Sequence, residues 1–248
     1  MPAELPKVET YDYALFGEVE IKPLGRIRQV ISKRLVASWV TVPHVAQFDE
    51  VDLTALDALR QRLVPKAEAA GLKLTLLPFI MKACAHALKA FPEFNASLDA
   101  SGEKLVLKKY CHIAFAAETP IGLLAPVVRD VDKKDLLETA DAVHALALKA
   151  KAGRLALSDA EGACFTVSNL GVLGGTGFTP IINAPEVGIL GVARASRKVV
   201  ELDGKFVSRL TLPLSLVYDH RVIDGAVGGR FLAFVRERLM DPDTLCAR

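Results

Sequence analysis

The chain has 248 residues, 51% of them apolar, which is enough for a sizeable core in one α/β domain or two small ones. Its 31 basic and 29 acidic residues give a formal charge of +2, so its mixed surface gives no electrostatic reason to expect a nucleic-acid partner. No apolar run approaches the roughly 20 residues of a membrane span, and the N-terminus lacks a signal-peptide pattern. We therefore expect an intracellular protein that does not enter a membrane.

Cysteine and histidine are too scattered to suggest a metal centre. The four cysteines form no Cys-x-x-Cys pair, and three of them lie within apolar segments, where a thiol behaves as a small hydrophobe. The five histidines form no His-x-His or His-Glu-x-x-His array. The sequence predicts reduced, structural cysteines and no metal.

The order of helix and strand patterns predicts the fold class. Residues 1–20 carry Pro2, Pro6 and several charges with weak periodicity, which is typical of a linker end or an N-terminal arm, and residues 21–248 form one domain. Apolar periodicity predicts helices over 26–39, 53–63, 78–91, 134–152 and 226–239, and Pro65 is expected to kink or end the second of these. Strands are predicted over 45–52, 72–77, 105–107, 110–117, 123–128, 164–168 and 187–193, and from a turn at 203–204 to 217. Because these elements do not alternate strictly, a mixed sheet covered on one face by helices is favoured.

The segment from Tyr218 to Gly225 places an imidazole and a carboxylate, His220 and Asp224, four residues apart where a strand ends and a helix begins. Such a spacing is also typical of a hydrogen-bonded histidine without a catalytic role. The spacing alone therefore leaves both interpretations open.

Two other patterns exclude common enzyme classes. The glycine-rich run 171–177 lacks the Gly-x-Gly-x-x-Gly order and opens no helix, and no Gly-Lys-Ser/Thr follows a glycine-rich loop, so neither a Rossmann site nor a P-loop is predicted. Ser168 follows a strand pattern but lacks the flanking glycines of a nucleophile elbow. A covalent serine mechanism therefore has little support.

Three blocks of sequence together carry a family resemblance. The His-x-x-x-Asp-Gly segment at 220–225, Cys-Phe-Thr-Val-Ser-Asn-Leu-Gly at 164–171 and Phe-Thr-Pro-Ile-Ile-Asn-Ala-Pro-Glu at 178–186 resemble the catalytic core of the dihydrolipoamide acyltransferases, the E2 components of 2-oxo acid dehydrogenase complexes. The resemblance runs from about Gly25 to the C-terminus, and only its last block is shared with chloramphenicol acetyltransferase. It implies a chloramphenicol-acetyltransferase-like two-layer sandwich with a mixed sheet.

The resemblance also implies an activity and roles for particular residues. It implies transfer of an acyl group from a dihydrolipoyl thiol to coenzyme A, and the block at 39–48 resembles the pyruvate-complex members, which favours acetyl. His220 would be the base, Ser168 would donate a hydrogen bond to the oxyanion, and Asp224 would pair with Arg26 to support the site. Contacts to substrate would come from Asn169, Gly174 and Gly175.

Further expectations concern partners. The lipoyl group would arrive on a separate lipoyl domain, and the E1 and E3 components would bind through upstream domains absent from this chain. A homotrimer with its site between subunits would assemble into a 24-mer cube or a 60-mer dodecahedron, in the bacterial cytoplasm or, as an open alternative, the mitochondrial matrix. Two other readings stay open, namely a catalytically silent scaffold or E3-binding homologue, and an antibiotic O-acetyltransferase of the chloramphenicol type.

Overall fold

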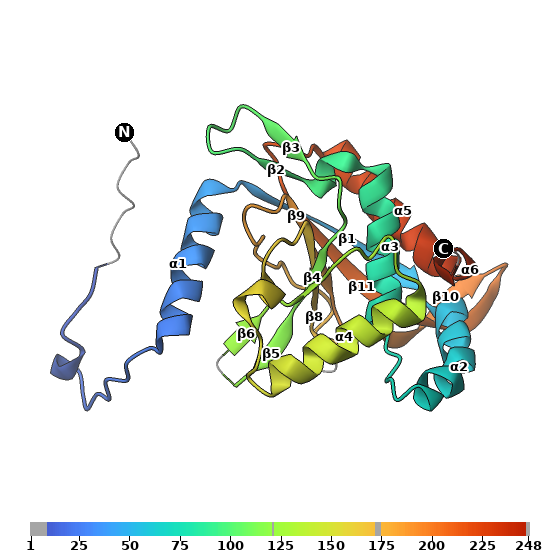
Figure 1. Cartoon of the computed structure of the whole chain (residues 1–248), viewed down its shortest axis with the longest axis horizontal. Helices are drawn as coiled ribbons and strands as arrows, with labels where there is room; N and C mark the ends of the chain where they lie inside the picture. Colours follow the sequence, from blue (N-terminus) through green and yellow to red (C-terminus); the bar gives the residue numbers. More distant parts are fainter. Residues whose placement is uncertain (1–8, 121, 172–174, 247–248) are drawn as a thin grey trace.

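The computed structural model describes residues 9–120, 122–171 and 175–246, which fold into helices, a main sheet and two small hairpins (Figure 1). The helices are α1 (Arg26–Thr41), α2 (Thr54–Ala69), α3 (Leu77–Ala90), α4 (Leu136–Lys151), α5 (Gly225–Met240) and α6 (Asp243–Cys246), with single 3₁₀ turns at Tyr13–Leu15, Pro92–Asn95 and Leu157–Ala160. The strands are β1 (His44–Asp52), β2 (Ala96–Leu98), β3 (Leu105–Leu107), β4 (Ile113–Phe115), β5 (Ala117–Thr119), β6 (Gly122–Leu124), β7 (Val127–Val128), β8 (Phe165–Asn169), β9 (Gly188–Val192), β10 (Ser196–Leu202) and β11 (Lys205–Asp219).

The main sheet is mixed, as the sequence predicts. Its order is β1-β11-β9-β8-β4-β7, with β10 paired to the first half of β11. Strands β4, β8 and β9 run parallel to one another, whereas β11 pairs antiparallel with β1, β9 and β10. The hairpins β2–β3 and β5–β6 stand outside this sheet.

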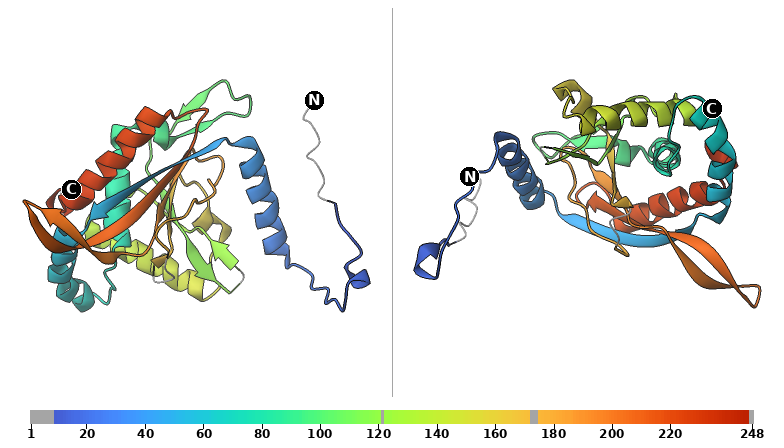
Figure 2. Two further views of the ribbon diagram at one scale, coloured as in Figure 1. Left: turned by 180° about the vertical axis from the view of Figure 1, so that it is seen from behind. Right: turned by 90° about the horizontal axis from the view of Figure 1, so that it is seen from below.

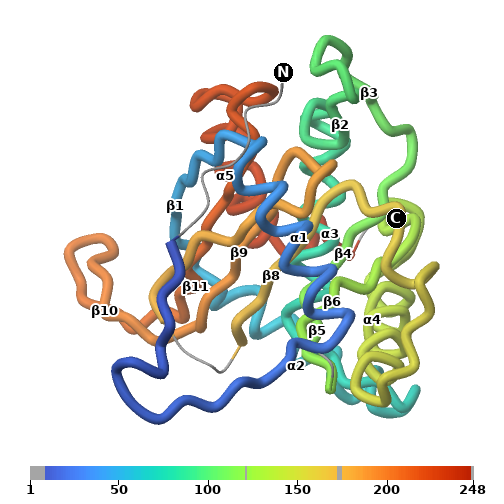
Figure 3. Tube along the Cα trace, turned by 90° about the vertical axis from the view of Figure 1, so that its left-hand side faces the viewer, coloured from blue at the N-terminus to red at the C-terminus, as the bar shows by residue number. Residues whose placement is uncertain are grey.

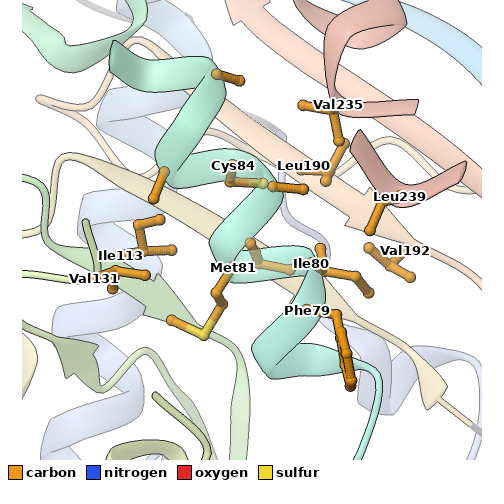
Figure 4. Packing of buried hydrophobic residues seen from close by; sticks show 14 of the residues in the cluster. Phe79, Ile80, Met81, Cys84, Ile113, Val131, Leu190, Val192, Val235 and Leu239 are labelled. Atoms are coloured by element: carbon orange, nitrogen blue, oxygen red, sulfur yellow. The ribbon is translucent and has the colours of Figure 1, made fainter. Parts of the chain in front are cut away.

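Helix α3 forms the centre of the core. Its side chains are buried on nearly every side, which is why its sequence is apolar almost all round. Figure 4 shows buried side chains of the sheet and of α5 packed around this helix. The residues labelled there are Phe79, Ile80, Met81 and Cys84 of α3, Ile113 of β4, Leu190 and Val192 of β9, Val235 and Leu239 of α5, and Val131, which follows β7.

The opposite face of the sheet is covered by the segment 175–186 and by the end of α1. Gly191 leaves room for the ring of Phe178, since a Cβ on Gly191 would lie 3.1 Å from that ring. The peptide groups of Ile182 are held on both sides, because Ser38 Oγ donates to its carbonyl at 2.5 Å and its N–H donates to His44 Nε2 at 3.1 Å. The first bond fastens the C-terminal end of α1 to the body of the domain, and the second joins the start of β1 to the same residue.

The N-terminal part of the chain extends away from that body. The arm before α1 and most of α1 lie apart from the other helices (Figures 1 and 2), and seen from the side they pass in front of the sheet (Figure 3). Ser38 alone is buried among the residues of α1. The large apolar side chains of this region that remain exposed are Tyr11, Tyr13, Leu15, Phe16, Val19, Ile21, Leu24, Ile27, Val30, Leu35, Val36, Trp39 and Val40.

Three details differ from the sequence prediction. The strand predicted over 72–77 is wrong, because this stretch pairs with no strand and its last residue, Leu77, already belongs to α3. Of the two outcomes expected at Pro65, a kink or an end of the helix, the end is wrong, because α2 continues to Ala69. The strand predicted over 123–128 is divided into β6 and β7, since the chain leaves one sheet at Ala125-Pro126 and joins another.

The packing of α5 against the sheet predicts opposite effects for two neighbouring glycines. An added Cβ on Gly228 would lie 2.6 Å from the Tyr218 ring and 2.9 Å from Gln47 Oε1, whereas on Gly229 it would approach nothing closer than 3.8 Å. Gly228→Ala should therefore lower the free energy of unfolding by roughly 1–3 kcal/mol through overpacking. Gly229→Ala is the matched control and should leave stability unchanged or raise it by up to about 1 kcal/mol, as alanine does within a helix. Urea denaturation measures both, and equal losses would contradict this account of the packing.

Candidate functional site

The turn that carries His220 is fixed by its backbone. Strand β11 ends at Asp219, whose carbonyl accepts hydrogen bonds from the N–H groups of Val222 and Ile223 at 3.0 and 2.9 Å. The N–H of His220 donates to the carbonyl of Pro43 at 3.0 Å, which ties the turn to the start of β1. The His220 side chain itself is exposed. The structure thus presents an accessible imidazole on a rigid turn at the edge between strand and helix.

Asp224 has a local role that the sequence reading did not assign. It is the N-cap of α5, and its Oδ1 accepts the N–H of Val227 at 2.8 Å. This hydrogen bond is the main reason that the pKa of Asp224 lies below its usual value, with smaller contributions from other neighbours. Asparagine caps helices about as well as aspartate, so capping alone does not require the charge.

The predicted pairing of Asp224 with Arg26 does not occur within the part of the chain that the structure describes, where neither a hydrogen bond nor an ion pair joins the two side chains. Arg26 is the first residue of α1, and the other end of that helix leads into Pro43 beside the His220 turn. A helix of 16 residues is about 24 Å long. Arg26 therefore lies too far along α1 to reach Asp224 of the same chain.

Ser168 lies in β8 on the sheet face opposite the helices, because its neighbour Val167 points into the core. The strand register pairs Ser168 with Gly191, and Gly191 with Ser215 of β11. His220 follows Ser215 by five residues, or about 16 Å of strand, and two strand spacings of roughly 5 Å separate β8 from β11. The side chains of Ser168 and His220 thus belong to positions nearly 20 Å apart and do not form one site within a single chain.

Of the three residues predicted to contact substrate, Asn169 is the last residue of β8 and Gly175 follows it by six residues in the chain. Asn169 Oδ1 accepts the N–H of Gly171 at 2.7 Å and so shapes the turn that follows the strand. Gly175 has a φ of +84°, a conformation that favours glycine. Gly174 lies outside the described residues. Substrate contact by these positions stays a prediction.

A buried acid near Ser168 was missed by sequence reasoning. Glu186 is almost fully buried, and its Oε2 accepts a hydrogen bond of 2.7 Å from Thr166 Oγ1, which in turn accepts one of 3.1 Å from Asn183 Nδ2. Burial raises the pKa of Glu186 to about 7, against the opposing effects of the Thr166 hydroxyl and of Lys108. The apolar run after Glu186 was the only sequence signal of its burial.

The cysteines are unpaired, as predicted, and Cys84, Cys111 and Cys164 are buried whereas Cys246 is exposed. Burial raises the pKa of the Cys111 thiol to about 12 and raises those of Cys84 and Cys164 as well. A thiol held in its neutral form is a poor nucleophile. Within the described ranges, His, Cys, Asp and Glu do not gather in threes as a metal site would need, and none of the helices there is both long and apolar enough to cross a membrane.

The fold and the matching sequence define the class of protein. The profile of the 2-oxoacid dehydrogenases acyltransferase family (catalytic domain) matches residues 16–247, and the chain belongs to that family. A chloramphenicol acetyltransferase structure, 16% identical, has the same fold with a TM-score of 0.53 over 84% of this chain and 92% of that one. The predicted fold class is thereby confirmed.

Particular relatives are far more similar. The dihydrolipoyllysine-residue acetyltransferase component of the pyruvate dehydrogenase complex of Pseudomonas aeruginosa is 53% identical over 98% of this chain, which spans 44% of that protein's length. A structure of the dihydrolipoamide acetyltransferase of Azotobacter vinelandii and one of the cubic core of the pyruvate dehydrogenase multienzyme complex each give a TM-score of 0.94 at 50% identity, covering 98% of this chain and 100% of the other. The chain thus spans less than half the length of that curated relative.

The Azotobacter structure belongs to a crystallographic and enzymatic investigation of one serine, one histidine and one asparagine in the catalytic mechanism of that protein. Those three residues stand 52 and then 4 residues apart in that chain. Ser168, His220 and Asp224 stand 52 and then 4 residues apart here. The serine and histidine are thus matched in type and spacing, and aspartate stands at the spacing of the asparagine.

The burial of Glu186 predicts how stability depends on pH. Its pKa of about 7 exceeds its ordinary value of 4.5, so the folded protein keeps a proton that the unfolded chain releases between these values. The resulting stabilisation is complete below pH 4.5 and is lost as the pH rises through 7. Glu186→Gln should remove this dependence, so that from pH 5 to 8 the variant gains up to roughly 3 kcal/mol relative to the unchanged protein.

Unfolding free energies across that pH range measure the effect. Glu201, exposed in β10, provides the matched control Glu201→Gln. A constant difference between Glu186→Gln and the unchanged protein at every pH would mean that Glu186 is not protonated in the folded state.

Proposed function

We propose that this chain transfers an acetyl group from the thiol of a dihydrolipoyl arm to the thiol of coenzyme A. The observation that carries this proposal is the spacing of Ser168, His220 and Asp224, which matches the three residues studied in the mechanism of the Azotobacter acetyltransferase. The high identity to pyruvate-complex components over nearly the whole chain favours acetyl among acyl groups.

His220 suits the proton transfers of this reaction. An alkyl thiol with a pKa of ~8.5 attacks a carbonyl as its thiolate, and a neutral imidazole accepts its proton near neutral pH. The coenzyme A sulfur then bonds to the thioester carbonyl carbon while the carbonyl oxygen takes the negative charge. When the intermediate collapses, the bond to the dihydrolipoyl sulfur breaks and that sulfur takes the proton back from His220. The products are acetyl-coenzyme A and a dihydrolipoyl group with both thiols free.

Ser168 suits the charge that appears between these two steps. Its hydroxyl lies on the sheet face opposite the core helices, the residue is only partly buried, and no hydrogen bond of this hydroxyl is found within the described residues. A neutral hydroxyl stabilises an oxyanion without needing a base to activate it. We assign Ser168 this role, with Asp224 as the cap that supports the turn of His220.

A second copy of the chain would complete the site. The sheet register keeps Ser168 and His220 of one chain nearly 20 Å apart, whereas the exposed arm and α1 offer an extensive apolar surface to a neighbour. A trimer with His220 of one subunit facing Ser168 of the next satisfies both observations. Further assembly into a hollow core is proposed from the cubic core of the similar structure. The donor lipoyl domain and the E1 and E3 components would then be partners outside this chain.

Removal of the base tests the proposal directly. The unchanged protein should catalyse acetyl transfer between dihydrolipoamide and coenzyme A, and His220→Ala should lower that rate by about 10²–10⁴-fold while leaving the oligomer intact. His144→Ala, on α4, is the control histidine and should keep full activity. An inactive unchanged protein would favour the silent scaffold, and transfer to chloramphenicol but not to dihydrolipoamide would favour the antibiotic-type alternative.

Replacement of Ser168 separates transition-state stabilisation from substrate binding. Ser168→Ala should lower kcat by about 10²–10³-fold and leave KM for both thiols near its original value, because the charge on the oxygen exists only in the intermediate. Steady-state kinetics with each thiol varied in turn provide the measurement. A raised KM with an unchanged kcat would make Ser168 a binding residue instead.

A further inference from the structure

The residues on either side of His220 form an ion pair across it. The carboxylate of Asp219, a residue only 2% exposed, accepts hydrogen bonds from Arg221 Nη2 at 2.7 Å, from Arg221 Nε at 3.0 Å and from the backbone N–H of Arg221 at 3.0 Å. Two of these bonds come from the planar guanidinium, so they fix its angle as well as its distance. The backbone on both sides of His220 is thus held by one charged contact.

The imidazole of His220 takes no part in this contact. The side chains of Asp219 and Arg221 meet each other, and His220 between them is left pointing to solvent. The ring of the fully buried Tyr218 lies behind the turn, with its centroid 6.2 Å from that of His220. The two opposite charges of the ion pair largely cancel at His220. We therefore expect the pair to act on His220 through geometry and not through its electric field.

We propose that the Asp219–Arg221 ion pair is the positioning device of His220, which aims the imidazole at the thiol without touching either substrate. This inference rests on the proposed function, since it concerns the residue to which we assign the proton transfer. A displacement of about 1 Å in a reacting group can cost a hundredfold in rate. Loss of the pair should therefore reduce kcat and leave KM unchanged.

A competing role exists for Arg221. Its side chain is 44% exposed, and a guanidinium also binds phosphate groups, which coenzyme A carries. If Arg221 binds coenzyme A, its loss raises KM for coenzyme A and leaves KM for dihydrolipoamide unchanged. If Asp219 and Arg221 only stabilise the fold, activity follows stability. The experiment must separate these three roles.

The test compares three variants. Arg221→Lys keeps the charge but loses the planar fork. Arg221→Met leaves the buried carboxylate of Asp219 without its guanidinium partner and should lower both the melting temperature and kcat. The double variant Asp219→Asn with Arg221→Met removes both charges, so its melting temperature should recover towards that of the unchanged protein. Its kcat should stay about 10- to 100-fold low, because the pair that aims His220 is still missing.

Each result decides between the roles. A double variant that regains stability but not kcat, at unchanged KM for both thiols, supports the proposal, as does a low kcat in Arg221→Lys. Recovery of kcat together with the melting temperature would overturn it in favour of a structural role, and a selective rise in KM for coenzyme A would overturn it in favour of binding.

A distant ion pair provides the matched control. Arg60 donates to Asp57 at 2.7 Å in α2, so Arg60→Lys should leave kcat unchanged. If the unchanged protein transfers no acetyl group, the proposed function fails. If it does and Arg221→Lys retains full kcat, the positioning role alone fails.

Discussion

The pairing of strand β11 is the constraint on which the rest of the structure depends. This strand of 15 residues pairs with β10 through its first part, with β1 along most of its length and with β9 near its end. Its buried half contributes to the core under the helices, and its last residue, Asp219, begins the His220 turn. The same hydrogen-bond ladder therefore fixes the core, the position of His220 and the distance from His220 to Ser168.

Much of the fold could be predicted because local pattern and tertiary environment agree. The apolar runs of β1, β8, β9 and β11 and the helical periodicity of α3, α4 and α5 each match a buried surface in the structure, whereas the apolar side chains of α1 remain exposed. Prediction failed where an apolar stretch has another use. The residues from Leu72 to Thr75 have strand-like composition, but they connect α2 to α3 and have no neighbouring strand with which to pair.

The candidate site was less predictable because its contacts depend on backbone geometry that spacing does not encode. His220 and Ser168 were found through their motifs, and the resemblance implied a site between subunits, but the distance between them within one chain follows only from the strand register. The burial of Asp219 and its bonds to Arg221 are invisible in the sequence, since an aspartate and an arginine two residues apart usually lie in solvent. The burial of Glu186 was also not predicted, because it depends on how the segment 175–186 crosses the sheet.

The strand geometry supports the proposal that the site is divided between subunits. The His220 turn must be rigid, and it gains rigidity by standing at the end of a long strand, next to the C-terminal end of α1. The proposed oxyanion donor must also be rigid, and Ser168 gains this from β8, whose parallel partners place it near the opposite end of the same sheet. Two rigid positions on one sheet cannot approach each other without breaking the ladder that makes them rigid. A second copy of the chain removes this conflict, because rigid elements of two subunits can meet across an interface while each sheet stays intact.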